Sequence, residues 1–426
     1  MSLFFFIVFF TGLLAAGMPI AFSMITASVL YAFFNGIDLG FLGTQMYASM
    51  NNFILMAIPL FLLASEIMDK TLISKRMFKF ANSLVGVIPG GLGHVNVLTS
   101  IIFSGMSGAA VADAGGIGRL CYRAMVEEGY DKPFSMSLTA ASAVIGPIIP
   151  PSIPFVVYAM VMNESVGKLF FGGIIPGLIL GLALMAYVFI IAIKRKYKAS
   201  AQFSFSVLLR SFKEAFLSLM TPLILLGTIY FGVVTVTEAA AVAVIYACIL
   251  GFIVYRNLTI RDFWDSLKKV FFLSGSIVLL FPAAKVFGFV LIKEDIPQLM
   301  MQFTKGFAGE PLLIILFVNI VFFVMGCISD PLVNIMLFMP IFQPLIQASG
   351  LSSIHFGIMI VLNAMIGLIT PPVGALLITI NSFDKVKFSD LMKETWPFIL
   401  IEVFVLGIVV FFPQTVLYIP NLLFEK

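Results

Sequence analysis

Apolar stretches long enough to cross a lipid bilayer recur along this chain, and they restrict its possible folds more than any other feature. A helix rises about 1.5 Å per residue, so about 20 apolar residues cross the hydrocarbon layer. Hydrophobic residues make up 61% of the 426 residues and charged residues 11%, whereas a soluble domain has about 45–50% and 25%. We therefore expect an all-α polytopic membrane protein with on the order of ten spans. An outer-membrane β-barrel is excluded, because alternating polar residues would dilute the hydrophobicity.

Charges and turn residues separate the apolar helical segments. These segments lie at about residues 50–69, 134–162, 167–193, 217–233, 237–255, 267–292, 355–382 and 397–420. The opening run, residues 3–34, is interrupted at Gly17, Met18 and Pro19, so it is either one long kinked helix or two short segments. The first basic residue of the chain is Lys70. Without a charged leader, we expect no signal peptide.

Two further segments, residues 92–120 and 311–349, are broken near their middles by Gly, Ser, Asp or Pro. Each half of the first segment forms about 20 Å of helix, which is short of a hydrocarbon layer about 30 Å thick. We therefore expect this segment to be a re-entrant hairpin that enters and leaves on one side. The halves of the second segment are longer, about 18 residues each, so length alone leaves its topology open.

Positive charge tests this arrangement, because Lys and Arg concentrate in cytoplasmic loops. If the first hairpin enters from the cytoplasm and the second from outside, most of the 25 basic residues fall in cytoplasmic loops. These loops hold the basic clusters around Lys75, Arg123, Lys196, Arg261 and Lys387. The same topology places the C-terminus outside.

Composition and motifs exclude several classes of function. The net charge of +4 is small and scattered, which argues against a nucleic-acid partner. Cys121, Cys248 and Cys327 have neither metal-ligand nor disulfide spacing. The chain has 2 histidines and no His-Glu-x-x-His or Gly-x-Ser-x-Gly motif. An intramembrane hydrolase would therefore lack its catalytic groups, and we expect no enzyme activity.

The chain contains an internal repeat at two helices broken by consecutive prolines. Residues 143–152 align without gaps on residues 364–373, with six of ten positions identical at an offset of 221. The same offset places Asp113 on Asn334, so the two broken hairpins correspond as well. Five predicted crossings separate the hairpins, and an odd number inverts the second copy. The pattern predicts inverted-topology repeats, each with a hairpin and a Pro-broken helix.

Consecutive prolines remove backbone donors and release carbonyl groups from the helical hydrogen-bond ladder. In the middle of a membrane, such backbone is tolerated only where it lines a cavity or meets a ligand. Carbonyl oxygens suit Na⁺, and the N-termini of half-helices suit an anionic substrate. The alternative is that Pro151 and Pro372 only kink packed helices and that the small residues serve close packing. The occurrence of two matched copies favours a transport site.

Several stretches of the chain resemble the large membrane subunit of the tripartite ATP-independent periplasmic (TRAP) transporters, and the resemblance covers essentially the whole chain. The resemblance includes residues 56–61, 103–113, 146–152, 237–243 and 363–374. The resemblance implies an elevator-type secondary transporter of the bacterial inner membrane, driven by a Na⁺ gradient. It also implies a small four-helix membrane subunit and a periplasmic substrate-binding protein as partners. The substrate would be a small organic acid, such as a C4-dicarboxylate, sialic acid or another sugar acid.

In that family, the two hairpins and the two broken helices form the transport domain, and the other helices form a scaffold. The resemblance divides this chain into N-terminal scaffold helices (1–85), a first transport half (86–162, with hairpin 92–120 and broken helix 134–162), further scaffold helices with an interfacial cytoplasmic helix near 203–216 (163–304), a second transport half (305–382, with hairpin 311–349 and broken helix 355–382) and a C-terminal helix (383–426).

The resemblance also implies where ions and substrate bind. The first Na⁺ site would use oxygens around Ser104, Ser107, Gly108, Gly146 and Pro150. The second would use oxygens around Gly326, Ser329, Asp330, Gly367 and Thr370. The substrate would lie between the hairpin tips, near Ser107, Asp113, Asp330, Asn334 and Asn363. Because Ile149 stands opposite Thr370 in the repeat, the two ion sites need not be equivalent.

Other polar residues have structural alternatives. Asp330 could equally cap the helix that begins at Pro331, and Glu238 is expected to cap a helix after Thr235. Lys285 lies within a predicted span, where its partner could be Glu66, Glu402, a lipid or another subunit.

Two other functions remain compatible with these residues. A stand-alone Na⁺-coupled carboxylate carrier would use the same hairpins without a binding protein. A passive ion channel could also be built from bare carbonyls, but a paired repeat around two sites fits alternating access better.

Overall fold

The computed structural model describes residues 3–303, 310–348 and 350–424. Regular secondary structure in these residues is helical throughout, which confirms the all-α prediction. Five of the helices described are long and apolar enough to cross a membrane alone, and a bent pair adds a sixth candidate. Single helices that could cross alone are thus fewer than the order of ten spans expected from the sequence. Several apolar segments fold as helices of 10–17 residues instead, because Gly and Pro end them early.

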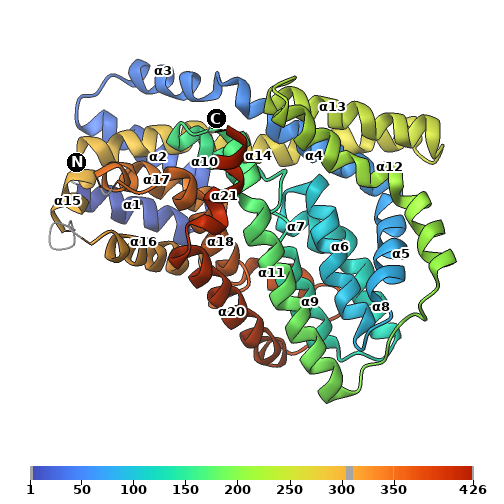
Figure 1. Ribbon diagram of the computed structural model, residues 1–426. Coiled ribbons are helices and arrows are strands. Elements are labelled where there is room, and N and C mark those ends of the chain that lie inside the picture. Colours follow the sequence, from blue (N-terminus) through green and yellow to red (C-terminus); the bar gives the residue numbers. More distant parts are fainter. Residues whose placement is uncertain (1–2, 304–309, 349, 425–426) are drawn as a thin grey trace.

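The opening run forms two helices. Helix α1 (Leu3–Ala15) and helix α2 (Ile20–Phe34) are separated by Gly17, which has a φ of +85°. The rings of Phe6 and Tyr31 pack edge to face at 5.6 Å between their centroids, and Figure 1 shows the two helices side by side. Of the two alternatives for residues 3–34, the structure has the two short segments.

Helix α3 (Leu39–Met50) follows and was not anticipated from the sequence. A short 3₁₀ turn (Phe53–Met56) then leads into α4 (Ala57–Lys70). Helix α3 and the stretch Phe53–Lys70 meet at an angle of 57°. Helix α5 (Ile73–Val85) carries basic residues on one side. It is therefore not apolar throughout and is not among the predicted apolar segments.

The first hairpin region consists of α6 (Gly91–Ser107), α7 (Ala110–Asp113), the π-helical turn η2 (Ala114–Gly118) and α8 (Arg119–Glu127). It is followed by α9 (Lys132–Ala143) and α10 (Ile153–Met162), which are separated by an irregular stretch. We refer to residues 144–152 as the first break.

The middle of the chain holds most of the long helices. They are α11 (Val166–Arg195), α12 (Phe205–Tyr230), α13 (Val236–Cys248) with the π-helical extension η3 (Ile249–Val254), and α14 (Ile260–Lys293). The interfacial placement expected near residues 203–216 stays a prediction. Residues 205–216 form the start of α12, which continues without a break into the predicted span. No Gly or Pro occurs in its first half to stop it.

The remaining helices are α15 (Ile296–Phe303), α16 (Pro311–Gly326), α17 (Pro331–Ala348), α18 (Ser353–Gly367), α19 (Ala375–Asn381), α20 (Phe388–Phe411) and α21 (Gln414–Phe424). We refer to residues 368–374 as the second break. The predicted segment 397–420 is split between α20 and α21 by Phe412 and Pro413. The expected boundary between residues 304 and 305 lies outside the described residues.

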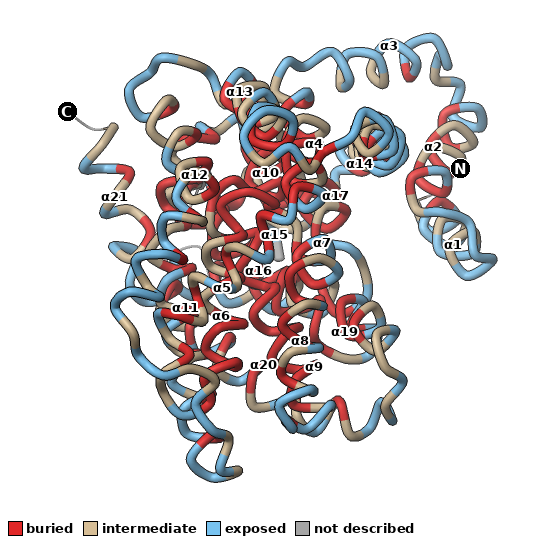
Figure 2. The backbone as a smooth tube through the Cα atoms, turned by 90° about the vertical axis from the view of Figure 1, so that its right-hand side faces the viewer, coloured by how far each residue is buried: buried red, intermediate tan, exposed pale blue. Residues whose placement is uncertain are grey.

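The two broken helices lie in the core of the molecule. Every residue of α18 from Ile354 to Gly367 is buried, and so is every residue of α9 from Phe134 to Ala143. Helices that are buried on all sides must be surrounded by other helices. Figure 1 shows α16 and α17 at one end of the molecule and α5, α6 and α8 at the other, with α11 between them. In Figure 2 the buried backbone fills the middle and exposed backbone surrounds it.

Candidate transport site

The first break lies against the tip of the first hairpin. Gly108 ends α6 with a φ of +66°, and a Cβ atom at this position would lie 2.4 Å from the carbonyl oxygen of Pro151. The backbone N–H of Ile153 donates to the carbonyl oxygen of Gly108 at 3.4 Å. Only glycine combines this backbone conformation with so close an approach. The carbonyl that meets the tip belongs to Pro151, the residue after the predicted Pro150.

Asp113 brings a carboxyl group to the same place. Its side chain is 1% exposed, and a Cβ atom on Gly146 would lie 2.0 Å from Asp113 Oδ2. The Ser107 hydroxyl lies close to this carboxyl group, although neither group completes a hydrogen bond within the described residues. A buried, unpartnered carboxylate is costly, so a bound cation or proton would stabilise this carboxyl group.

Ser104, also predicted for the first ion site, is buried beside the tip. Its hydroxyl donates to the carbonyl oxygen of Ile101 at 2.6 Å, so it is bonded within its own helix. Its lone pairs stay available as acceptors. The structure thus gathers Ser107, Gly108, Asp113 and Gly146 around one point.

The second break lies against the connection between α16 and α17 in a comparable way. A Cβ atom on Gly367 would lie 2.4 Å from the carbonyl carbon of Gly326, so the two helices touch through bare backbone. The N–H of Val373 donates to the carbonyl oxygen of Cys327 at 3.2 Å. The Thr370 hydroxyl donates to the carbonyl oxygen of Ile366 at 2.7 Å.

Ser329 and Asp330 form the tip of this second region. The Ser329 hydroxyl donates to Asn334 Oδ1, and Asn334 Nδ2 donates to the carbonyl oxygen of Ser329 at 3.4 Å. Asp330 Oδ1 accepts from the N–H of Leu332 at 2.8 Å, which confirms that Asp330 caps α17. Asn334, the counterpart of Asp113, is thus bonded to its own tip, so the two halves differ chemically.

Polar bonds also join each hairpin to its broken helix. Ser142 of α9 donates to Asn96 Oδ1 of α6 at 2.8 Å, and Asn363 of α18 donates to Asn319 Oδ1 of α16 at 2.6 Å. Ser142 and Asn363 occupy matched positions of the repeat. The structure therefore gives Asn363 a role in helix packing, and its contact with substrate stays a prediction. The offset of 221 between the repeats already relates Ser142 to Asn363 in the sequence.

The two halves meet where α19 packs against α7 and η2, and Figure 2 shows α19 beside α8 and α9, below α7. Asp113 ends α7, and the second break leads directly into α19. The predicted site residues of the two halves therefore lie on, or next to, elements that contact one another.

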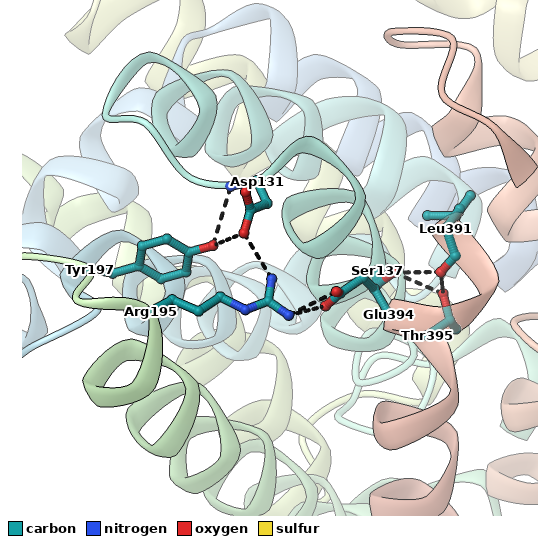
Figure 3. Close-up of polar contacts among 7 residues, drawn as sticks. All are labelled: Asp131, Ser137, Arg195, Tyr197, Leu391, Glu394 and Thr395. Atoms are coloured by element: carbon teal, nitrogen blue, oxygen red, sulfur yellow. Dashed lines mark hydrogen bonds and ion pairs between the residues drawn. The ribbon is translucent and has the colours of Figure 1, made fainter. Parts of the chain in front are cut away.

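The sequence did not predict the polar network around the start of α9, which Figure 3 shows. Arg195 of α11 contacts Asp131 at 2.9 Å and Glu394 of α20 at 2.7 Å. The Tyr197 hydroxyl donates to Asp131 Oδ2 at 2.7 Å. Figure 3 also shows the hydroxyls of Ser137 and Thr395, which lie 2.8 Å apart. Nearby, the hydrogen bond from Lys132 lowers the pKa of the Asp384 carboxyl. These contacts fix α9 relative to α11 and α20.

The remaining polar predictions have mixed outcomes. Thr235 and Glu238 form a capping box, which confirms the capping role of Glu238. Glu66, one of the alternatives for a partner of Lys285, accepts instead from Lys269 Nζ at 2.7 Å. Glu402 is fully buried, and its carboxylate has no partner within the described part of the chain.

Comparisons with known proteins identify the family. A sequence profile described as "Tripartite ATP-independent periplasmic transporter, DctM component" matches residues 6–415. The sialic acid TRAP transporter large permease protein SiaM of Vibrio cholerae is 40% identical over 96% of both chains. The C4-dicarboxylate TRAP transporter large permease protein DctM of Pseudomonas aeruginosa is 36% identical over 89% of both chains.

A solved structure has a similar fold. The Alcanivorax borkumensis YdaH transporter superposes with a TM-score of 0.57 over 87% of this chain and 88% of that one. Its sequence is only 13% identical, so the likeness concerns the fold alone. The profile match and the two permease relatives show that the chain belongs to the DctM component of the tripartite ATP-independent periplasmic transporters.

Proposed function

We propose that this permease couples a Na⁺ gradient to the uptake of a small organic acid anion. Membership of the family makes the chain a transporter permease for small organic acids and not an enzyme. The single observation that supports Na⁺ coupling is the buried Asp113 carboxyl group beside Gly146, which has no partner among the described residues. A Na⁺ ion would supply the missing positive charge and accept hard oxygen ligands.

The residues present fit such an ion. In the first site, the Asp113 carboxylate, the Ser107 hydroxyl and carbonyls of the first break would hold Na⁺. In the second, oxygens around Gly326, Ser329, Asp330, Gly367 and Thr370 would do so. The close contact of Gly326 with Gly367 supports this second grouping, because no side chain stands between the two backbones at this point.

The substrate would lie between the two tips, near Ser107, Asp113, Asp330, Asn334 and Asn363. A Na⁺ ion at each break would offset the acidic residues there, so that an anionic substrate could approach. The relatives' names support an organic acid: sialic acid in Vibrio cholerae, 2,3-diketo-L-gulonate in Escherichia coli and a C4-dicarboxylate in Pseudomonas aeruginosa.

The matched hairpins and broken helices support a transport domain built of inverted repeats, which moves as an elevator against the scaffold helices. The proposed assembly holds a small four-helix membrane subunit and a periplasmic binding protein that delivers the substrate. It would reside in the bacterial inner membrane with the C-terminus of this chain in the periplasm.

The test is uptake by proteoliposomes that contain this chain with its candidate partners. We expect accumulation of an organic acid only when Na⁺ is imposed outside and binding protein is present. Full Na⁺-driven uptake by the isolated chain would instead identify a stand-alone carrier. Continuous unitary currents would identify a channel.

Two variants test the second ion site in the same assay. Ser329→Ala and Asp330→Asn should raise the Na⁺ or substrate concentration needed for half-maximal uptake without preventing membrane insertion. If both variants take up substrate as the wild type does, Ser329 and Asp330 serve only in the tip contact and in capping α17.

A further inference from the structure

A basic cavity of about 580 Å³ lies between α5 and the arm of the first hairpin formed by η2 and α8. Its charged lining consists of Lys75 and Lys79 from α5, Arg119 and Arg123 from α8, and Glu127. Four cations therefore face one carboxylate, and they come from two separate elements. A cavity of this size holds a small organic anion.

Three of these cations are not neutralised by acidic residues. Lys75, Arg119 and Arg123 form no ion pair with any residue that the structure describes, whereas nearby Arg195, Lys132 and Lys269 each have a carboxylate partner. Arg119 instead stacks over the ring of Phe383, with 5.4 Å between the guanidinium carbon and the ring centroid. Unpaired cations that converge on a cavity attract an anionic ligand.

The cavity adjoins the candidate transport site. Gly116 of η2 lines its wall, and Asp113 lies three residues before it on the same arm. A Cβ atom on Gly116 would lie 3.6 Å from Asp69 Oδ1, so the side chain of Asp69 lies beside this part of the wall. The apolar side chains of the lining are Phe78, Leu120 and Ala124.

We propose that this cavity is a release site for the transported anion on the cytoplasmic side. After the substrate leaves the hairpin tip, its carboxylate binds between Arg119 and Arg123 of the hairpin and Lys75 of α5. The inference rests on the proposed function, because it takes an organic acid as the substrate and the α5–α8 side as cytoplasmic.

The experiment compares both faces of the full three-component system in proteoliposomes, with labelled N-acetylneuraminate and succinate as probes. The variant Arg119→Gln/Arg123→Gln removes two cavity charges. The control Lys194→Gln/Lys198→Gln removes two exposed charges from the end of α11, outside the cavity. We expect the variant to raise the half-saturating concentration for exchange from the cytoplasmic face about 3- to 10-fold, with no change at the face supplied by the binding protein.

Further measurements separate charge from structure. Arg119→Lys/Arg123→Lys should restore most of the cytoplasmic-face affinity, and added choline chloride should weaken the wild type more than the Gln variant. Unchanged cytoplasmic half-saturation in the Gln variant would overturn the proposal. So would an effect that appears only in liposomes with anionic lipid, which would assign the cavity to a lipid headgroup. Absence of organic acid uptake by the wild-type system would contradict the proposed function itself.

Discussion

At the scale of single residues, the two halves of the molecule place different groups at the contact between a hairpin and its broken helix. Gly326 and Gly367 let two helices touch through backbone in the second half, whereas the Asp113 carboxyl group lies against Gly146 in the first. The counterpart of Asp113 is Asn334, whose amide bonds to its own tip. The repeat therefore provides one bare carboxyl group and one satisfied amide at matched positions.

The contact between Gly326 and Gly367 predicts a steep cost for a single methyl group. Gly367→Ala should separate α16 from α18 and destabilise the protein by about 1–3 kcal/mol, because overpacked cores strain their neighbours. The matched control is Gly407→Ala on α20, where a Cβ atom meets nothing within 4 Å. It should be neutral or stabilising by up to about 1 kcal/mol. Thermal unfolding in detergent measures both, and equal melting temperatures would contradict the contact.

The unpartnered carboxyl group predicts a link between Na⁺ and stability. Replacing choline by Na⁺ should raise the melting temperature of the wild type, because an ion that binds only the folded state stabilises it. Asp113→Asn should lose this rise and need at least about tenfold more Na⁺ for half-maximal uptake, since a charge-assisted contact is lost. Asp265→Asn, which changes an exposed side chain on α14, should keep both properties. A full Na⁺-dependent rise in Asp113→Asn would remove Asp113 from the ion site.

At the scale of elements, the irregular breaks of the two Pro-broken helices contrast with a helix end that polar contacts hold in place. Each Pro-broken helix is irregular for several residues where it meets a hairpin tip. By contrast, the start of α9 is bonded to α11 and α20 through Arg195, Ser137 and their partners (Figure 3). The irregular carbonyl groups are thus held between well-anchored helices, which suits a site that must bind an ion in a defined geometry.

Restoring regular helix at a break should weaken ion coupling. In Pro150→Ala/Pro151→Ala and Pro371→Ala/Pro372→Ala, the new N–H groups can bond to carbonyls of the preceding turn. In the wild type these carbonyls have other donors: Pro147 accepts from the Ser152 hydroxyl, and Leu368 accepts from the N–H of Leu376. We expect each variant to show weaker activation of uptake by Na⁺ while it still inserts into the membrane. Na⁺ titration of uptake measures this. Unchanged activation in both variants would mean that the released carbonyls do not bind the ion.

At the scale of the whole molecule, few helices are simple spans. Five of those described are long enough to cross a membrane alone, while the site is built from shorter helices buried in the centre. Half-length helices inside a bilayer need other helices around them, because lipid cannot satisfy their ends. The burial of α9 and α18 meets this requirement.

The proposed topology can be tested with two cysteine variants. Asn421→Cys places an exposed thiol on α21, and Lys194→Cys places one at the basic end of α11. Because basic ends stay in the cytoplasm, a membrane-impermeant thiol reagent should label Asn421→Cys in spheroplasts and Lys194→Cys only after permeabilisation. Cys121 and Cys327 are buried, and a cysteine-free parent removes the remaining background. The opposite labelling would invert the topology.

The sequence by itself determined the class of fold, the family and the regions of interest. Apolar segments require helices in lipid, and the Pro-Pro repeat is visible because proline and glycine restrict the backbone wherever they occur. Local patterns also predicted the cap at Glu238. Only the packing of helices in three dimensions pairs Glu66 with Lys269 and bonds Asn363 to Asn319. It also brought Asp113 against Gly146 and α5 against the hairpin arm. These contacts join residues far apart in the chain, and their partners depend on how whole helices pack, which no local pattern encodes.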